Sequence, residues 1–167
     1  MFVPFDSLPP TSRLWIYQAD RKFSPEERAI IESKLKLFTD GWAAHGHPLR
    51  SSFQIAYDQF IILAADEALQ TASGCSIDDS VRFVQDLGSQ LGVDFFNRNL
   101  IAFKEASGIR LIRLTELRQK LAEGAWSASS LTFNNLVNQK SGLETDWVIP
   151  SSSSWLSRYV GSEKVIH

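Results

Sequence analysis

The chain has 167 residues, a net charge of −2, 44% hydrophobic residues and 22% charged residues. This length suits one domain, and the net charge with its scattered Lys and Arg argues against the basic stripe of a nucleic-acid binder, although local basic patches stay open. One cysteine excludes an intramolecular disulfide bond. We expect no signal peptide, no transmembrane helix and no membrane partner, so the predicted location is the cytoplasm.

The first predicted elements are a strand and a helix. Residues 13–19 are rich in β-branched and aromatic side chains, which favours a strand. Ser24, Pro25 and Glu27 form a helix-start pattern, in which the serine caps the helix and the glutamate completes a capping box. We expect this helix to end near Gly46, because glycine suits the residue that terminates a helix.

A β-hairpin and a second helix are predicted next. Residues 51–57 alternate between apolar and polar side chains, as a half-buried strand does. Residues 60–65 are continuously apolar, which is typical of a central strand. Ser76 or Asp78 is predicted to cap the following helix, and Gly92 suits the left-handed residue that ends it.

The predicted order of elements indicates the fold class. Two further strands, over residues 100–104 and 109–114, precede a third helix that Thr115 can cap and Gly124 can end. The order βαββαβ, followed by a strand and a helix, is that of the ferredoxin-like arrangement, with an antiparallel sheet and both helices on one face. The sequence therefore predicts an α+β protein with a ferredoxin-like core.

The other face of this sheet needs a cover. It is expected to carry Trp15 or Tyr17, and large aromatic side chains do not stay bare. We expect residues 1–124 to form the core and residues 125–167 to form an aromatic-rich extension that packs on it, unless a second copy does so. The candidate covering residues are Trp126, Phe133, Trp147 and Trp155.

Cys75 is the main chemical candidate. It lies beside the predicted start of the second helix, where the helix dipole favours a thiolate. It can act as a nucleophile or a redox-sensing thiol, with His45 or His47 as a base. The alternatives are a small buried cysteine and two solvated loop histidines, because free cysteines are often buried and no partners complete a zinc site.

Acidic residues flank the loop before Cys75. Asp66 and Glu67 end the apolar strand, while Asp78 and Asp79 lie at the start of the next helix. Together these carboxylates can bind a ligand or Mg²⁺; separately they are a loop pair and a helix cap. No further ligand cluster supports a metal site, so no metal or other cofactor is predicted.

The C-terminal third holds a candidate binding surface. Trp147, Trp155 and Arg158 place aromatic rings and a guanidinium group close together in the sequence. Exposed aromatic residues beside arginine can recognise a peptide or a base, and the same residues can cover the open sheet face. Both interpretations stay open at this point.

Several segments, over residues 15–23, 52–67, 73–87 and 132–140, resemble a bacterial family of similar length often labelled "ABC transporter ATPase". The resemblance spans most of the chain and implies a single-family bacterial domain, with no catalytic residues to carry over. An ABC ATPase requires a Walker A loop, and residues 41–48 lack its Lys and Ser/Thr. We therefore expect no bound nucleoside triphosphate.

The sequence thus favours a non-catalytic binding or self-association module, with a homodimer or a protein partner and no nucleic acid. The alternative is a thiol-dependent enzyme or redox sensor that uses Cys75. A third interpretation is a Mg²⁺-dependent enzyme that acts on phosphate groups through the acidic residues.

Overall fold

The computed structural model describes residues 1–161, and internal contacts divide the chain into two compact units. The first unit consists of Met1–Phe96 and Leu136–Gly142; the second consists of Asn97–Asn135 and the chain from Leu143 onward. Both contain antiparallel strands and helices, which confirms the α+β class. The predicted boundary at Gly124 falls inside the second unit, and residues 125–161 do not form a unit of their own.

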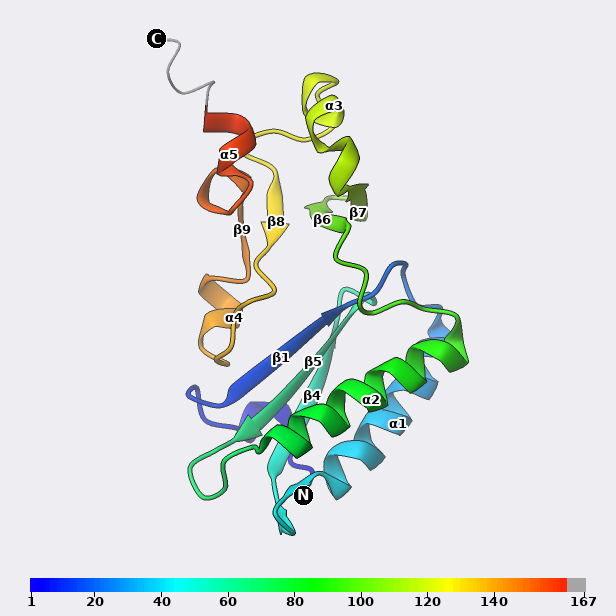
Figure 1. Cartoon of the computed structure of the whole chain (residues 1–167), viewed down its shortest axis with the longest axis vertical. Coiled ribbons are helices and arrows are strands. Elements are labelled where there is room, and N and C mark those ends of the chain that lie inside the picture. The colour runs from blue at the N-terminus through cyan, green and yellow to red at the C-terminus, as the bar shows by residue number, and fades with distance from the viewer. Residues whose placement is uncertain (162–167) are drawn as a thin grey trace. The chain divides into compact units, whose positions relative to one another are not determined.

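The first unit contains a three-stranded antiparallel sheet of order β1-β5-β4, and α1 and α2 lie side by side on one face of it (Figure 1). As predicted, β5, which is buried from Phe60 to Ala65, is the central strand. β1 and β4 are the edges of this sheet. The elements of this unit are η1 (Phe5–Ser7), β1 (Arg13–Gln18), α1 (Pro25–Gly41), β2 (Ala43–Ala44), β3 (His47–Pro48), β4 (Arg50–Ala56), β5 (Phe60–Asp66) and α2 (Gly74–Leu91).

The fourth strand of the predicted ferredoxin-like arrangement is not in this sheet. β6 (Leu100–Glu105) forms a hairpin with β7 (Gly108–Arg113) and pairs on its other side with β8 (Leu131–Phe133). A two-residue turn joins β6 to β7, since Glu105 lies opposite Gly108. A hairpin this short closes at low entropic cost, so β6 pairs with its neighbour in sequence.

The edge of β1 is instead occupied by a short segment from much later in the chain. Arg13 forms an isolated antiparallel bridge with Gln139. The amide of Leu14 donates to the carbonyl of Asn138 at 3.0 Å. The amide of Lys140 donates to the carbonyl of Ser12 at 2.9 Å. These bonds satisfy backbone groups of β1 that would otherwise lie at an open sheet edge.

Capping boxes begin both long helices. At α1, Ser24 Oγ accepts from the Glu27 amide at 3.1 Å and Glu27 Oε1 accepts from the Ser24 amide at 2.9 Å, which confirms the prediction. α2 begins earlier than predicted, because Ser73 is the cap and Ser76 is the reciprocal partner in the box. Gly92 ends α2 with φ of 67°, as predicted. None of the helices in residues 1–161 combines the length and hydrophobicity of a membrane-spanning segment.

Helix α1 ends at Gly41 rather than near Gly46. Gly46 instead forms the turn between β2 and β3 together with His45, and their φ angles are 77° and 52°. Two consecutive residues with positive φ are typical of the tight turn of a β-hairpin. Gly46 therefore belongs to the β2–β3 turn, which follows α1, and does not end the helix.

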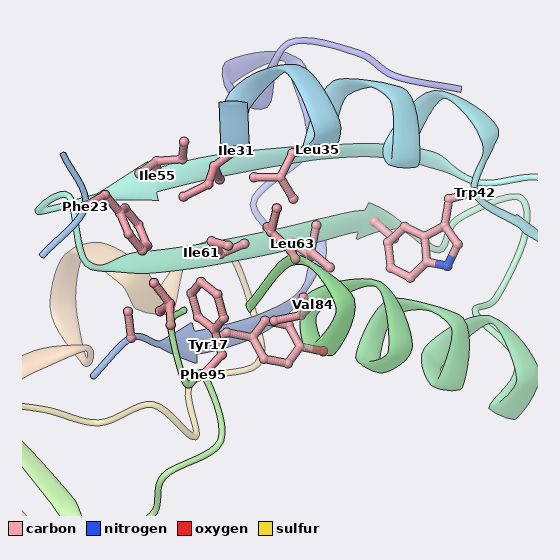
Figure 2. Close-up of a cluster of buried hydrophobic side chains, with 14 of the residues drawn as sticks. Tyr17, Phe23, Ile31, Leu35, Trp42, Ile55, Ile61, Leu63, Val84 and Phe95 are labelled. Carbon is pink, nitrogen blue, oxygen red and sulfur yellow. The ribbon is translucent and has the colours of Figure 1, made fainter. Parts of the chain in front are cut away.

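The core of the first unit lies between the sheet and the two helices (Figure 2). Ile31 and Leu35 of α1 and Ile61 and Leu63 of β5 are fully buried there. Tyr17 belongs to this same cluster. The expectation that the opposite sheet face carries Trp15 or Tyr17 is therefore wrong, because Trp15 also packs against the helix-side cluster.

The second unit contains a four-stranded sheet of order β7-β6-β8-β9. Its core holds the fully buried Leu117 and Leu156 together with Trp126, whose indole nitrogen donates to the carbonyl of Leu117 at 2.8 Å. The remaining elements are η2 (Leu114–Glu116), α3 (Leu117–Ala122), α4 (Gly142–Thr145), β9 (Val148–Pro150), η3 (Ser151–Ser153) and α5 (Ser157–Val160).

Candidate functional site

The carboxylates at the end of β5 pair with arginines of the neighbouring strands. Asp66 lies 3.6 Å from Arg50 of β4, and Glu67 lies 3.8 Å from Arg13 of β1. Glu67 also accepts a hydrogen bond from the amide of Ala72 at 2.7 Å. These contacts connect the strand ends with the loop before α2. They engage Asp66 and Glu67, the two carboxylates that the sequence predicted as ligand-binding groups.

Cys75 is exposed and is the second residue of α2. The sequence predicted that Cys75 precedes the helix, whereas the structure places it inside the first turn of α2. The neighbouring Ser76 carbonyl accepts a hydrogen bond from the Trp42 indole at 2.8 Å, which ties this turn to the end of α1. The exposure removes the interpretation of Cys75 as a buried packing residue.

His45 and His47 lie on a surface hairpin, and a joint role with Cys75 stays a prediction. His45 and His47 are both exposed on the β2–β3 hairpin. Within residues 1–161, no three His, Cys, Asp or Glu side chains come together in a way that can hold a metal ion. Asp78 is exposed on the surface of α2, and the adjacent Asp79 pairs with Arg82 of the same helix.

A cavity of about 500 Å³ lies at the C-terminal end of α2. Val84 and Gly88 of the helix and Phe95 and Phe96 of the following segment provide its apolar wall. Phe96 is 40% exposed, and its ring meets the Tyr17 ring edge-on at 5.7 Å between centroids. A volume of this size is within the range that small ligands or single side chains occupy.

Two aspartates line the polar side of this cavity. Asp20 Oδ1 accepts from the amide of Asp94 at 3.0 Å, and the amide of Asp20 donates to the carbonyl of Asp94 at 3.0 Å. Asp94 Oδ1 accepts from the amide of Phe96 at 2.8 Å. Each carboxylate has acceptor positions beyond these bonds, because an ionised carboxylate offers about four.

Arg21, which follows Asp20 in the chain, interacts electrostatically with Asp20 but directs its hydrogen bonds to other groups. Arg21 donates to the carbonyl of Leu91 at 2.8 Å and forms two hydrogen bonds with the Glu27 carboxylate. In the part of the chain that the structure describes, no Lys or Arg forms an ion pair with Asp20 or Asp94. The last carbonyls of α2 add the negative end of the helix dipole. The two aspartates and the helix end therefore make the surroundings of the cavity negative, and the ring of Phe96 is exposed beside them.

Tyr17 packs against the exposed ring of Phe96. Its hydroxyl lies 3.4 Å from the Ser80 hydroxyl of α2, and Ser80 donates to the carbonyl of Ile77 at 2.6 Å. Burial raises the pKa of the Tyr17 phenol, so this group stays protonated at neutral pH. Tyr17 is thus a fixed support for Phe96.

A second site lies in the second unit, on α3, α5 and the turn before α5. We call it the arginine–aromatic surface, and it consists of Arg118, Trp155, Arg158 and Tyr159. Trp155 is 43% exposed, and its ring meets that of Tyr159 edge-on at 6.0 Å. Arg158 lies over the Trp155 ring at 5.5 Å, and Arg118 lies over the Tyr159 ring at 5.0 Å. The structure thus brings together two of the three residues that the sequence assigned to a C-terminal binding surface.

The third of those residues, Trp147, is only 5% exposed. Its ring packs against that of Phe133 at 5.2 Å, and its indole nitrogen donates to Asn135 at 2.9 Å. Trp147 is therefore a structural residue of the β8–β9 region. The coverage of the first unit's sheet by this part of the chain stays a prediction.

Sequence reasoning missed Asp20, Asp94 and Phe96. Asp94 and Phe96 lie just after the helix end at Gly92. An Asp side chain that accepts a hydrogen bond from the amide two residues later is a recognisable local pattern. Nothing in the sequence indicated that Asp20 meets this segment. Comparison with known proteins found no matching family model, no matching curated protein and no matching solved structure.

Proposed function

We propose that this protein is a non-catalytic binding module whose first unit binds a positively charged group in the cavity at the end of α2. The observation that carries the proposal is the cavity itself, which is lined by an exposed aromatic ring and by two aspartates that form no ion pair with the described residues. A ligand with an ammonium or guanidinium group and an apolar body fits this combination.

The chemistry of recognition follows from these groups. The cation is attracted by Asp20, Asp94 and the carbonyl end of α2, and its apolar part packs on Phe96. A bare metal ion suits the cavity less well, because half of the wall is apolar and only two carboxylates are present. The ligand is either a small organic amine or a lysine or arginine side chain of a partner protein.

The test is a titration with phenethylamine and with its neutral counterpart phenethyl alcohol, followed by NMR chemical shifts of the Asp94 and Phe96 amides. We expect the amine alone to shift these signals. Asp94→Asn should weaken the binding about fivefold, since exposed charge pairs contribute up to about 1 kcal/mol. Asp78→Asn is the matched control, because Asp78 is an exposed carboxylate of the same unit and does not line the cavity. Equal shifts with the alcohol would count against the proposal.

The source of the cation can be determined by the same titration. A peptide that contains one lysine, compared with the same peptide after acetylation of that lysine, reports on recognition of a protein side chain. Binding of the unmodified peptide at lower concentration than phenethylamine favours a protein partner. Light scattering over a concentration series tests the homodimer that the sequence predicts.

A thiol function at Cys75 is the second candidate, and its exposure is the observation that favours it. An exposed thiol is accessible to oxidants and electrophiles, whereas a buried one is inert. Cys75→Ser should remove any thiol-dependent activity and leave the melting temperature unchanged, because the side chain is at the surface.

A further inference from the structure

The arginine–aromatic surface is held rigidly by the core of the second unit. Leu156, the N-cap residue of α5, and Val160 at the end of α5 are both fully buried in that core. Trp155, Arg158 and Tyr159 belong to the same short segment and lie at the surface or half-buried. Tyr159 is further fixed by the buried Trp126, whose ring it meets edge-on at 6.1 Å. The exposed groups are therefore preorganised, which lowers the entropic cost of binding.

The two guanidinium groups of this surface have no anionic partner in the described chain. Arg118 and Arg158 are exposed, and their recorded contacts are with the Tyr159 and Trp155 rings. Elsewhere in residues 1–161, arginines such as Arg82 and Arg110 pair with carboxylates. The nearby Lys120 is also paired, with Glu123 at 3.4 Å.

Stacking on a ring leaves the donor edge of a guanidinium group free. Arginine presents five N–H donors in a planar fork that matches the geometry of a carboxylate. With Arg158 held over Trp155 and Arg118 over Tyr159, two such forks lie on either side of one half-exposed aromatic pair. This arrangement complements a chain in which acidic residues alternate with apolar ones.

We propose that the arginine–aromatic surface docks an acidic peptide segment of a partner protein. Carboxylates of the segment accept hydrogen bonds from the guanidinium groups of Arg118 and Arg158, and an apolar side chain between them packs on the exposed part of Trp155. Charge complementarity selects this occupant, and the site is distinct from the cavity of the first unit.

A nucleic acid fits this surface less well. Single-stranded binders stack bases on open aromatic faces, but Arg158 already lies over the Trp155 ring. Binders of phosphate backbones use several cations, and this surface presents only two guanidinium groups. The chain as a whole also carries a net charge of −2.

The experiment is fluorescence anisotropy with a fluorescein-labelled peptide of alternating Glu and Leu and with the matched peptide of alternating Gln and Leu. We expect the full chain to bind the Glu peptide and to lose binding as salt rises, because the contact is electrostatic. Arg118→Gln and Arg158→Gln should each weaken it about fivefold, as expected for exposed charge pairs. Arg98→Gln is the matched control, since Arg98 is an exposed arginine of the same unit.

Several outcomes would overturn the proposal. These are equal binding of the Gln peptide, an equal loss with Arg98→Gln, or tighter binding of oligothymidylate than of the Glu peptide. A dimer that dissociates on Arg158→Gln while no peptide binds would assign the surface to a second copy of the chain instead. Circular dichroism and the melting temperatures of the Arg118→Gln and Arg158→Gln variants verify that both remain folded, as expected for exposed side chains.

Discussion

Gly88 of α2 lies directly against the carbonyl oxygen of Val93. A Cβ atom placed on Gly88 would stand 2.4 Å from that oxygen, closer than any real contact. The amide of Val93 also donates to the carbonyl of Gly88 at 2.9 Å. The segment after α2 therefore folds back against Gly88, a position where only glycine fits. This segment forms part of the wall of the cavity at the end of α2.

Gly88→Ala is expected to destabilise the protein by about 2 kcal/mol, because the added methyl group overlaps a backbone atom that cannot move independently. Alanine favours a helix by up to about 1 kcal/mol, so the observed loss is the difference of two effects. Chemical denaturation measures it. Gly74→Ala is the control, since a Cβ there meets nothing within 4 Å. Equal stability of the two variants would contradict this account.

Glu27 should make stability depend on pH in the acid range. The hydrogen bonds from Arg21, and then that from the Ser24 amide, lower the pKa of Glu27 to about 2. The folded state therefore favours the ionised form, and this contribution is complete above the usual carboxyl pKa of about 4.3. It is lost as the pH falls toward 2.

Glu27→Gln tests this dependence, because glutamine can keep the capping-box hydrogen bond but cannot pair with Arg21 as an ion. We expect a lower melting temperature than wild type at pH 7 and a difference that disappears near pH 2. The measurement is a series of thermal melts over that range. A difference that is constant with pH would show that charge is not its cause.

Cys75 should react with iodoacetamide in the folded protein, because its side chain is exposed. Mass spectrometry of the intact chain measures the extent of alkylation. The alkylation rate in denaturant is the reference for a fully accessible thiol. Comparing the pH midpoint of the reaction in the two states shows whether the first turn of α2 activates the thiol. A thiol protected until unfolding would contradict the exposed position.

Two tryptophans of the second unit should respond very differently to replacement by phenylalanine. Trp126 is 2% exposed and donates to the Leu117 carbonyl, so Trp126→Phe leaves a small cavity and an unpaired acceptor. We expect a loss of about 2 kcal/mol. Trp155 is 43% exposed, and Trp155→Phe should change stability by less than about 0.5 kcal/mol. Denaturation curves of the two variants provide the comparison.

The features that the sequence predicted correctly are local ones. Ser24 and Glu27 lie within one turn of a helix, and Gly92 ends α2 through its own backbone conformation. The place of β6 was not predictable in this way, because the strand can pair with β1 or with β7 and the pattern of side chains suits both. The sheet order of the first three strands followed from burial along β5.

In the candidate sites, too, contacts between residues close in the sequence could be predicted, whereas contacts between distant residues could not. Trp155 and Arg158 are three positions apart in one segment, so their proximity could be anticipated from spacing alone. Asp20 and Asp94 are separated by 74 positions, and only the fold brings them together. Cys75 could be placed beside a helix start, but its exposure depends on tertiary packing that the local sequence does not encode.

The bridge between Arg13 and Gln139 has a consequence for biosynthesis. When the ribosome has translated the chain as far as Gly124, every helix and strand of the first unit has been made, but the edge of β1 that does not pair with β5 is still uncovered. The nascent chain therefore presents a bare strand edge, on which other chains can pair. A truncated product that stops before Gln139 keeps this edge permanently. Such fragments should aggregate, although they contain the whole helix-covered sheet.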